Sequence, residues 1–232
     1  MPVDRDYFSR LYGRQDDPWG IGTRWYEARK RALLMATLPR ERFARAFEPG
    51  CGGGHLTVEL APRCDALVAM ELADSAAGQA RQRVAEFAHV QVLTGELPQQ
   101  WPEGSFDLIV FSELGYYFPK SDWHEVAALA AGALSEDGVI VACHFRHLFA
   151  EQQITAQAVH DAIGAQPGLY RHIHHQEPDF TMDLWSRRLE MRLAGNLGLG
   201  LGLGLGLGLG LRLPSRKAPK PSKKNAPHTT SA

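Results

Sequence analysis

The sequence predicts an α/β fold in which a doubly wound sheet of seven strands, mostly parallel, ends in a C-terminal antiparallel hairpin. Two observations carry this prediction. Between residues 40 and 145, short apolar runs alternate with stretches of helical periodicity, as in chains where helices connect parallel strands. Further along, two runs are separated only by a Glu-Pro-Asp turn, and strands joined so closely pair antiparallel. We therefore expect an open sheet of the Rossmann-like type.

Apolar runs bounded by glycine, proline or aspartate give the expected strands. They cover residues 44–48, 66–71, 90–94, 106–112 and 139–144, followed by hairpin strands at residues 169–176 and 180–187. Helices are expected at residues 55–63, 75–87, 122–134 and 153–165. One face of the third helix carries Trp123, Val126, Ala127, Ala130 and Leu134, and a stripe on the fourth carries Ile154, Ala158 and Ala162. Each stripe is expected to pack on the sheet.

Length and composition favour one main domain. The chain has 232 residues, of which 44% are hydrophobic and 22% charged, which is typical of a globular protein with one sizeable core. Three cysteines form neither a CxxC pair nor an even-numbered framework, so we expect no disulfides and a cytoplasmic location. The N-terminus lacks an apolar leader and no run reaches the roughly 18 apolar residues of a membrane span, so we expect neither export nor a spanning helix.

Charge and composition divide the chain into three segments. The formal net charge is −1, but residues 191–232 hold seven basic and no acidic residues, so residues 1–190 carry −8. The net negative charge of residues 1–190 argues against nucleic-acid binding by the folded part.

Residues 197–210 alternate leucine with glycine before a basic, proline-rich stretch, so we expect residues 192–232 to form a disordered, solvated tail. A nucleic-acid or membrane-surface arm is the alternative. Residues 1–40 are assigned to an N-terminal lid.

The stretch FEPGCGGGH at residues 47–55 links the first expected strand to the first helix. Glycines there let the backbone approach a ligand while helix N–H groups point at it. A dinucleotide fingerprint needs GxGxxG, but His55 stands where the last glycine belongs, which disfavours a nicotinamide dehydrogenase. Glu48 precedes the glycines instead. A carboxylate at this place suits a ligand that carries a cation better than it suits a pyrophosphate.

The string from Glu48 to Gly54, E-x-G-x-G-x-G, resembles motif I of class I S-adenosylmethionine (SAM)-dependent methyltransferases. In that family the acid bonds the amino end of SAM, directly or through water. The resemblance implies that residues 41–191 form a SAM-binding methyltransferase domain. The implied contacts from the loop are Glu48, Gly50, Cys51, Gly52, Gly54 and His55. Cys51 has no indicated partner base, so we interpret it as a small lining residue and not as a nucleophile.

Two further acids fit a nucleoside ligand. Glu71 ends the second expected strand, where a carboxylate can accept both ribose hydroxyls. Glu96 follows the third strand, where this fold usually presents an acid to the adenine amino group. The alternatives are a strand-end acid that faces water and an ordinary turn. The other residues assigned to this part of the cofactor site are Leu72, Gly95, Leu97 and Ser112.

Further stretches resemble the NodS-like methyltransferases, named after the nodulation protein that N-methylates a deacetylated chitooligosaccharide. They are DDPWGIGTRWYEARK at residues 16–30, SELGYYF at residues 112–118, CHFRH at residues 143–147 and the closing DFTMDLWSR. The resemblance implies that Trp19, Trp25 and Lys30 lie over the methionine end of SAM. The alternative is that the aromatic residues only dock the first helix on the sheet. Arg24 departs from the pattern, since the nodulation protein carries a small hydroxyl residue there.

Ligands of this architecture bind beyond the carboxyl ends of the strands, so residues 112–118 and 144–147 should border one crevice. An amine acceptor must lose its proton before methyl transfer, and a carboxylate or an imidazole can take it. We assign this role to Glu113 and His144. A strand-end histidine and core-packing tyrosines are the alternatives. The residues assigned to substrate contacts are Tyr116, Tyr117 and Arg146.

The sequence thus predicts SAM-dependent methyl transfer to a small acceptor, which the resemblance narrows to an amine or aminosugar nitrogen. The alternatives are O- or carboxyl-methylation of a small metabolite and a catalytically silent SAM-binding protein. We expect a small-molecule partner and no nucleic acid on the folded domain. His172, His174 and His175 cluster in one expected strand, but no cysteine or acid stands at matching spacing, so we expect no metal site.

Overall fold

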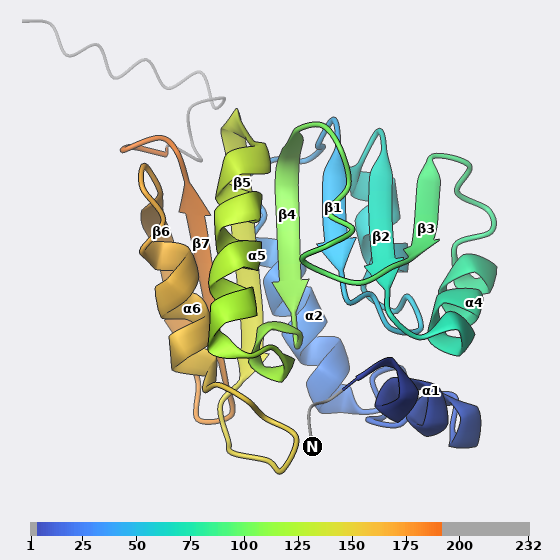
Figure 1. Ribbon diagram of the computed structural model, residues 1–232. Helices are drawn as coiled ribbons and strands as arrows, with labels where there is room; N and C mark the ends of the chain where they lie inside the picture. The colour runs from blue at the N-terminus through green and yellow to red at the C-terminus, as the bar shows by residue number, and fades with distance from the viewer. Residues whose placement is uncertain (1–3, 192–232) are drawn as a thin grey trace, which may run out of the picture. The chain divides into compact units, whose positions relative to one another are not determined.

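The computed structural model describes residues 4–191, so the predicted disorder of residues 192–232 falls outside the described part. Seven strands form one sheet in the order β3-β2-β1-β4-β5-β7-β6. They are β1 (Ala46–Pro49), β2 (Leu67–Glu71), β3 (Val90–Thr94), β4 (Phe106–Ser112), β5 (Leu134–Phe145), β6 (Tyr170–Gln176) and β7 (Phe180–Ser186). Neighbours from β3 to β5 are parallel, whereas β7 runs antiparallel to both β5 and β6. The predicted doubly wound sheet with a C-terminal hairpin is confirmed (Figure 1).

Helices cover both faces of the sheet. They are α1 (Arg5–Arg14), α2 (Trp25–Thr37), α3 (Thr57–Leu60), α4 (Asp74–Arg83), α5 (Lys120–Ala133) and α6 (Ala156–Gly164), with short 3₁₀ turns η1 (Ala61–Arg63) and η2 (Gly115–Tyr117). Phe111 of β4 packs in one core with Trp123 of α5 and Ile163 of α6. Its neighbour Val110 packs in a second core with Leu34 of α2. Figure 1 shows α5 and α6 in front of the sheet and α2 behind it.

The differences from the predicted boundaries have local causes. The helix expected at residues 55–63 divides into α3 and η1, because Pro62 has no N–H to continue the α-helical bonding. β5 begins at Leu134, earlier than expected, and follows α5 without a loop. Of the stripe predicted for α6, Ala162 is buried and Ile154, just before the helix, packs against the core, but Ala158 is only partly buried. The prediction missed the buried Val159, His160 and Ile163.

The order of the strands places a crevice at the carboxyl ends of β1 and β4. β2 and β3 extend the sheet on one side of β1, and β4 and β5 extend it on the other. The segments that follow β1 and β4 therefore leave the sheet in opposite directions, which is where ligands of open α/β sheets bind. The N-terminal helix α1 lies just beyond this edge of the sheet in Figure 1. Asp4 caps α1, since its Oδ1 accepts the Tyr7 N–H at 2.9 Å.

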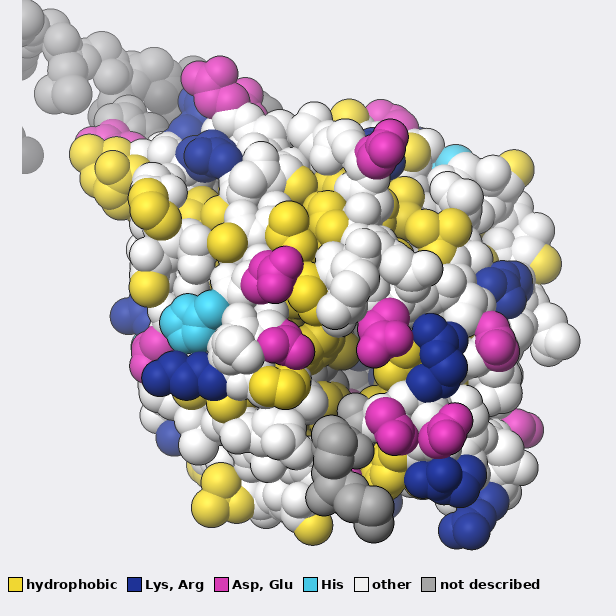
Figure 2. All heavy atoms as spheres, in the orientation of Figure 1, with side chains coloured by type: hydrophobic (Ala, Val, Ile, Leu, Met, Phe, Trp, Pro, Cys, Tyr) yellow, Lys and Arg dark blue, Asp and Glu magenta, His cyan; other side chains and the backbone are white. Residues whose placement is uncertain are grey.

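The face of the molecule seen in Figure 2 carries charges of both signs. Lys and Arg side chains are interspersed with Asp and Glu side chains, and apolar atoms show between them. Interspersed charges of this kind give no extended field of one sign. Among the helices of residues 4–191, none combines the length and the apolar character that crossing a membrane requires.

Gly54, in the loop after β1, is predicted to be necessary for the approach of this loop to α4. Its φ is +81°, and an added Cβ would lie 2.9 Å from the Cα of Ala80. Gly54→Ala should therefore lower the free energy of unfolding by about 1–3 kcal/mol. Gly78→Ala is the matched control, because an added Cβ in the middle of α4 meets no atom within 4 Å. That change should raise the free energy of unfolding by up to about 1 kcal/mol. Urea denaturation measures both, and equal effects would contradict the prediction.

Candidate functional site

A cavity of about 650 Å³ lies at the carboxyl ends of β1, β2 and β4. Helices α1 and α2 and the loop between them also contribute to its wall. The sequence-predicted residues that line the cavity are Trp19, Lys30, Glu48, Gly50, Cys51, Gly52, His55, Glu71, Leu72, Gly95, Glu96, Leu97, Ser112, Glu113, Tyr116 and Tyr117. The volume is in the range of pockets that enclose cofactors or small ligands. Residues spread over about a hundred positions of the sequence thus meet at one site.

The glycine loop after β1 is bonded to the end of β2. The N–H groups of Gly50 and Cys51 both donate to the Met70 carbonyl, at 2.7 and 3.0 Å. Gly52, whose φ of +53° suits glycine, donates its N–H to Glu71 Oε2 at 2.9 Å. The second oxygen of Glu71 accepts the Ala73 N–H at 3.0 Å. One carboxylate thus joins the glycine loop to the start of α4, and each of its oxygens retains a second lone pair.

Glu48, at the end of β1, is a buried acid without a complete set of partners. It lines the cavity, and its Oε2 has no hydrogen-bond partner among the described residues. Burial raises the pKa of Glu48 to about 8; the neighbouring Thr57 hydroxyl acts in the opposite direction, and the nearby charge of Glu71 adds to the rise. Burial likewise raises the pKa of Glu71, although the backbone N–H groups on its carboxylate act in the opposite direction. A buried acceptor without a donor is costly, so Glu48 fits a ligand that brings a cationic donor.

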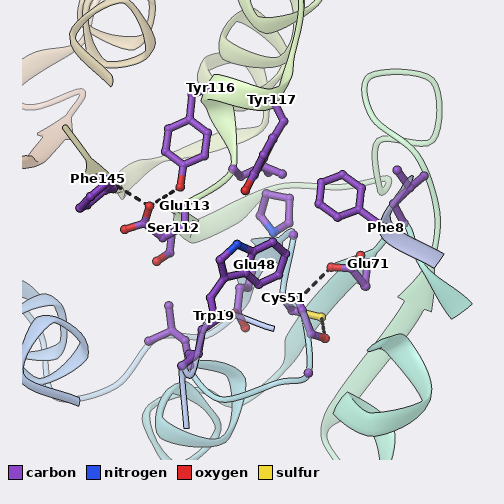
Figure 3. Close-up of a pocket in the computed structure, with 18 of the residues that line it drawn as sticks. Phe8, Trp19, Glu48, Cys51, Glu71, Ser112, Glu113, Tyr116, Tyr117 and Phe145 are labelled. Carbon is purple, nitrogen blue, oxygen red and sulfur yellow. Dashed lines mark hydrogen bonds between the residues drawn. The ribbon is translucent and has the colours of Figure 1, made fainter. Parts of the chain in front are cut away.

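The N-terminal segment covers this part of the cavity with aromatic rings. Trp19, from the loop before α2, packs against Tyr12 and Phe8 of α1, with ring centroids 5.7 and 6.5 Å apart. The Asp17 carboxylate shapes the loop, because it accepts the N–H groups of Ile21 and Gly22 at 2.6 and 2.9 Å. Figure 3 shows Trp19 and Phe8 reaching into the site from different elements. The ring of Trp19 is therefore fixed by packing before any ligand binds.

Glu113 follows β4 and is held by three hydrogen-bond donors. Its Oε1 accepts from Lys30 Nζ at 2.6 Å, and its Oε2 accepts from the Phe145 N–H at 3.0 Å and from the Tyr116 hydroxyl (Figure 3). Lys30 also pairs with Glu27 at 2.9 Å. Burial lowers the pKa of Lys30, but the charges of Glu113 and Glu27 outweigh burial and hold that pKa above its usual range. Lys30 is thus a buried cation, and it fixes the direction of the Glu113 carboxylate.

Beyond Glu113 the cavity wall is aromatic and acidic. Tyr117 packs edge-on against Phe8 at 5.2 Å and lies 5.8 Å from Phe149, centroid to centroid. Burial raises the pKa of Tyr117, and the charges of Glu113 and Glu151 add to the rise. Besides Glu48, the acidic side chains that line the cavity are Glu27, Glu71, Glu96, Glu113, Asp122, Glu151 and Asp179, against the cations Arg24, Lys30 and Arg31. This excess of carboxylates favours ligands with positive charge.

Three predicted site residues have side chains or backbone directed elsewhere, and their placement is corrected. Trp25 begins α2 with 77% of its surface exposed and does not line the cavity. Arg146 donates to the Glu177 carbonyl at 2.7 Å, in the turn between β6 and β7. Gly54 faces Ala80 of α4, and its lack of a side chain allows the loop to pack closely against that helix. In each case the residue lies in a segment next to the cavity but does not face it.

The expected role of His144 as a base that faces the substrate is also corrected. His144 is fully buried, and its Nε2 accepts the Gly115 N–H at 3.1 Å. Burial lowers the pKa of His144 well below its usual value, and nearby His160 and Lys30 add to the effect. Its Nδ1 contacts His160 Nε2 at 3.0 Å, so both ring nitrogens are occupied. The strand-end position predicted proximity to the crevice, but helix α6 covers this face of β5.

The three histidines of β6 each contact a protein group. His172 Nε2 lies 2.9 Å from Ser186 Oγ, His174 Nδ1 lies 2.7 Å from Asp183 Oδ1, and His175 Nε2 lies 3.0 Å from Glu177 Oε1. Their ring nitrogens do not converge on one point. Among residues 4–191 no group of three or more His, Cys, Asp or Glu side chains has the arrangement that a metal ion needs.

Several lining residues escaped the sequence-based prediction. Phe8 and Tyr12 come from α1, and Glu27 lies one turn before Lys30 on α2. Phe149 and Glu151 come from the segment after β5. The spacing of Phe8 and Tyr12 by four residues marks one face of a helix and was a usable signal. No comparable pattern identifies the residues after β5, because their position depends on how that segment folds back to η2.

Comparison with known proteins decides the family. The family model for nodulation protein S (NodS) matches residues 7–151, which is more than half of the chain. The chain belongs to the NodS family. Among curated NodS proteins, that of Rhizobium tropici is 34% identical over 103 residues, covering 44% of this chain and 43% of the relative. That of Sinorhizobium fredii is 31% identical over 103 residues, covering 44% of this chain and 48% of the relative. The match therefore spans less than half the length of these NodS relatives.

Solved structures place the NodS-family fold among methyltransferases. A Pseudomonas syringae protein, provisionally assigned as a methyltransferase, is 49% identical with a TM-score of 0.63, covering 70% of this chain and 99% of that one. The N-methyltransferase NodS from Bradyrhizobium japonicum, in complex with S-adenosyl-L-homocysteine (SAH), has a TM-score of 0.71 at 22% identity, covering 78% of this chain and 96% of that one. The latter likeness shows the shared fold.

The raised pKa of Glu48 predicts a pH-dependent stability. Between pH 4.5 and pH 8 the unfolded chain releases the proton of this carboxyl group while the folded protein keeps it. The free energy of unfolding should therefore fall as the pH rises through this window, and level off above it. Glu48→Gln removes the titrating group, so the stability of the variant relative to that of the parent should increase from pH 5 to pH 8. Urea denaturation across this range is the measurement, with the exposed Glu125→Gln as control. Parallel profiles for Glu48→Gln and the parent would contradict the assignment.

Proposed function

We propose that this protein is a SAM-dependent methyltransferase that acts on a nitrogen of a small amine or aminosugar. The observation that carries the proposal is the pair of buried acids at the glycine loop. Glu48 presents an oxygen without a partner, and Glu71 holds the loop while retaining free lone pairs. This arrangement suits a nucleoside that bears a cationic amino end. Family membership and the methyltransferase fold support the same activity.

The residues present fit SAM, which when bound supplies a methyl group on a positively charged sulfur. Glu48 would accept from the amino end, and Glu71 would accept from the ribose hydroxyls. Residues 95–97 would border the adenine. Trp19 would present its ring to the sulfonium, since aromatic faces attract cations. Each of these residues lines the same cavity, which supports a shared ligand.

The acceptor is proposed to bind beside Glu113, Tyr116 and Tyr117. The carboxylates of this region favour an amine over a carboxylate acceptor, which they would repel. Glu113 accepts from Lys30, Tyr116 and the Phe145 N–H, so taking up a proton would disturb its ion pair. We therefore assign Glu113 to orienting the amine and Glu151, which also lines the cavity, to receiving its proton.

Methyl transfer needs the acceptor close to the donor and water kept away. The rings of Phe8, Tyr117 and Phe149 form an apolar wall that serves this purpose. O-methylation of a small metabolite is the second candidate, favoured by the Tyr116 hydroxyl and Glu113 pair, which could hold an alcohol by hydrogen bonds. Three buried free cysteines support a proposed location in the cytoplasm.

Binding of SAM is predicted to release a proton from Glu48. This carboxyl group has a pKa of about 8 and is largely protonated at pH 7, whereas an ammonium group at Oε2 favours the carboxylate. The binding enthalpy measured at pH 7 should therefore change with the ionisation enthalpy of the buffer. Glu48→Gln should abolish this dependence and weaken binding about tenfold or more. SAH, which keeps the amino end but not the sulfonium, should release the same proton. Calorimetry that detects no heat with either compound would refute the cofactor assignment.

Turnover of an amine acceptor should depend on Glu151. Initial rates with labelled SAM and a panel of aminosugars, polyamines, alcohols and small acids identify the acceptor class. For the best amine, Glu151→Gln should lower kcat/KM about tenfold, because proton removal commonly contributes 10²–10⁴-fold and solvent can replace part of it. The affinity for SAM should stay within about twofold of the parent, since the carboxylate lies on the acceptor side. Glu125→Gln on the exposed face of α5 is the control. Preference for acids over amines would overturn the proposed acceptor class.

A further inference from the structure

A chain of hydrogen bonds runs from the cavity wall into the core and out to β6. The Gly115 N–H donates to His144 Nε2 at 3.1 Å, and His144 Nδ1 lies 3.0 Å from His160 Nε2. His160 Nδ1 lies 2.6 Å from Asp183 Oδ2. The other oxygen of Asp183 lies 2.7 Å from Nδ1 of His174, which is partly exposed. His144, His160 and Asp183 are 0%, 2% and 1% exposed, so water cannot substitute for these partners.

The partners fix the position of every proton in this chain. Because Gly115 can only donate, His144 Nε2 must accept, and a neutral His144 then carries its proton on Nδ1. That N–H requires His160 Nε2 to accept, which leaves the His160 proton on Nδ1. The Nδ1–H of His160 ends at the Asp183 carboxylate, which can only accept. Burial lowers the pKa of His144 well below its usual value, which agrees with a neutral ring.

The chain begins at a backbone amide and so does not conduct protons to the cavity. What it holds in place is the turn after β4. Glu113 has a φ of +56°, a strained value for a residue with a side chain, and its N–H donates to the Cys143 carbonyl at 2.9 Å. Gly115 lies against Val159 and Trp123, where an added Cβ would approach within 2.5 and 2.8 Å. The bond from Gly115 to His144 holds this turn from the side of the core, in addition to the bonds that Glu113 makes with Lys30 and Phe145.

We propose that His144, His160 and Asp183 are positioning residues that set the acceptor wall, by fixing the turn that carries Glu113, Tyr116 and Tyr117. The predicted effect on turnover rests on the proposed function, whereas the hydrogen-bond network itself does not. Glu113 and Tyr116 are hydrogen-bonded to each other and line the cavity, so a shift of the turn moves both. The hydrogen bonds of Glu71 go to Gly52 and Ala73, and Leu114 is the residue of the turn that packs against the glycine loop, so we expect a shift of the turn to affect the acceptor more than SAM.

Two substitutions at His144 separate positioning from packing. His144→Gln keeps an acceptor for the Gly115 N–H, whereas His144→Leu fills similar space without one. With the best acceptor, His144→Leu should lower kcat about tenfold to a hundredfold, as misplacement of reacting groups does. The kcat of His144→Gln should be at least about threefold higher than that of His144→Leu. SAM affinity should stay within about twofold for both. His172→Gln, on β6 but outside the chain, is the control. A leucine variant as active as the glutamine variant would overturn the proposal.

Nuclear magnetic resonance tests the network without any turnover. The ¹⁵N signals of His144 should show Nδ1 protonated and Nε2 unprotonated near neutral pH. Hydrogen exchange of the Gly115 amide should be slow in the parent and in His144→Gln, and fast in His144→Leu. If the parent protein methylates no acceptor, the proposed function is refuted. The ¹⁵N signals and the exchange of the Gly115 amide still test the hydrogen-bond network in that case. A proton on His144 Nε2, or an equally protected Gly115 amide in His144→Leu, would refute it.

Discussion

The hydrogen bonds between the glycine loop and the end of β2 are the interaction on which the rest of the site depends. Gly50 and Cys51 share the Met70 carbonyl, and Gly52 reaches the Glu71 carboxylate. These bonds need left-handed backbone at alternate positions, which glycine adopts without strain. They continue the pairing of β1 with β2 beyond Pro49, so the loop stays beside the end of β2 where Glu48 and Glu71 face one cavity. Without them the two acids would be ordinary strand-end residues, and no common ligand could use both.

Glu48, Glu71 and Glu113 are acidic side chains in or near the protein interior, and the cost of burying each is offset in a different way. Glu48 has few partners, and burial raises its pKa to about 8, so it holds a proton near neutral pH. Glu71 is stabilised by two backbone N–H groups. Glu113 is paired with the buried Lys30. Each means suits a different role: Glu48 can give up its proton to a cationic ligand, Glu71 can share lone pairs, and Glu113 can only orient what lies beside it.

The sequence predicted the sheet well because buried parallel strands are short, apolar and bounded by turn residues. β3 and β4 have the predicted limits, and the glycine loop was found by its composition. What could not be predicted is which side of a segment faces the cavity. His144 was expected to meet a substrate, but α6 covers it, and the stripe predicted for α6 did not include the buried His160. The pairing of His144 with His160 depends on how α6 packs on β5, so no local pattern could reveal it.

The N-terminal segment, proposed from the sequence as one lid of residues 1–40, divides into parts with different physical character. Leu34 of α2 belongs to the core beneath the sheet, and Lys30 is a buried cation held by Glu113 and Glu27. Removing α2 from the sheet would expose that core and leave Glu113 without its ion pair, which is costly for a partly buried carboxylate. α1 is joined to the start of α4 through the buried Tyr12 and through Arg5, which donates to the Leu72 carbonyl at 2.6 Å. The loop with Trp19 adds aromatic contacts with Tyr12. We therefore infer that the residues before Trp25 form the cover of the site, while α2 is part of its fixed wall.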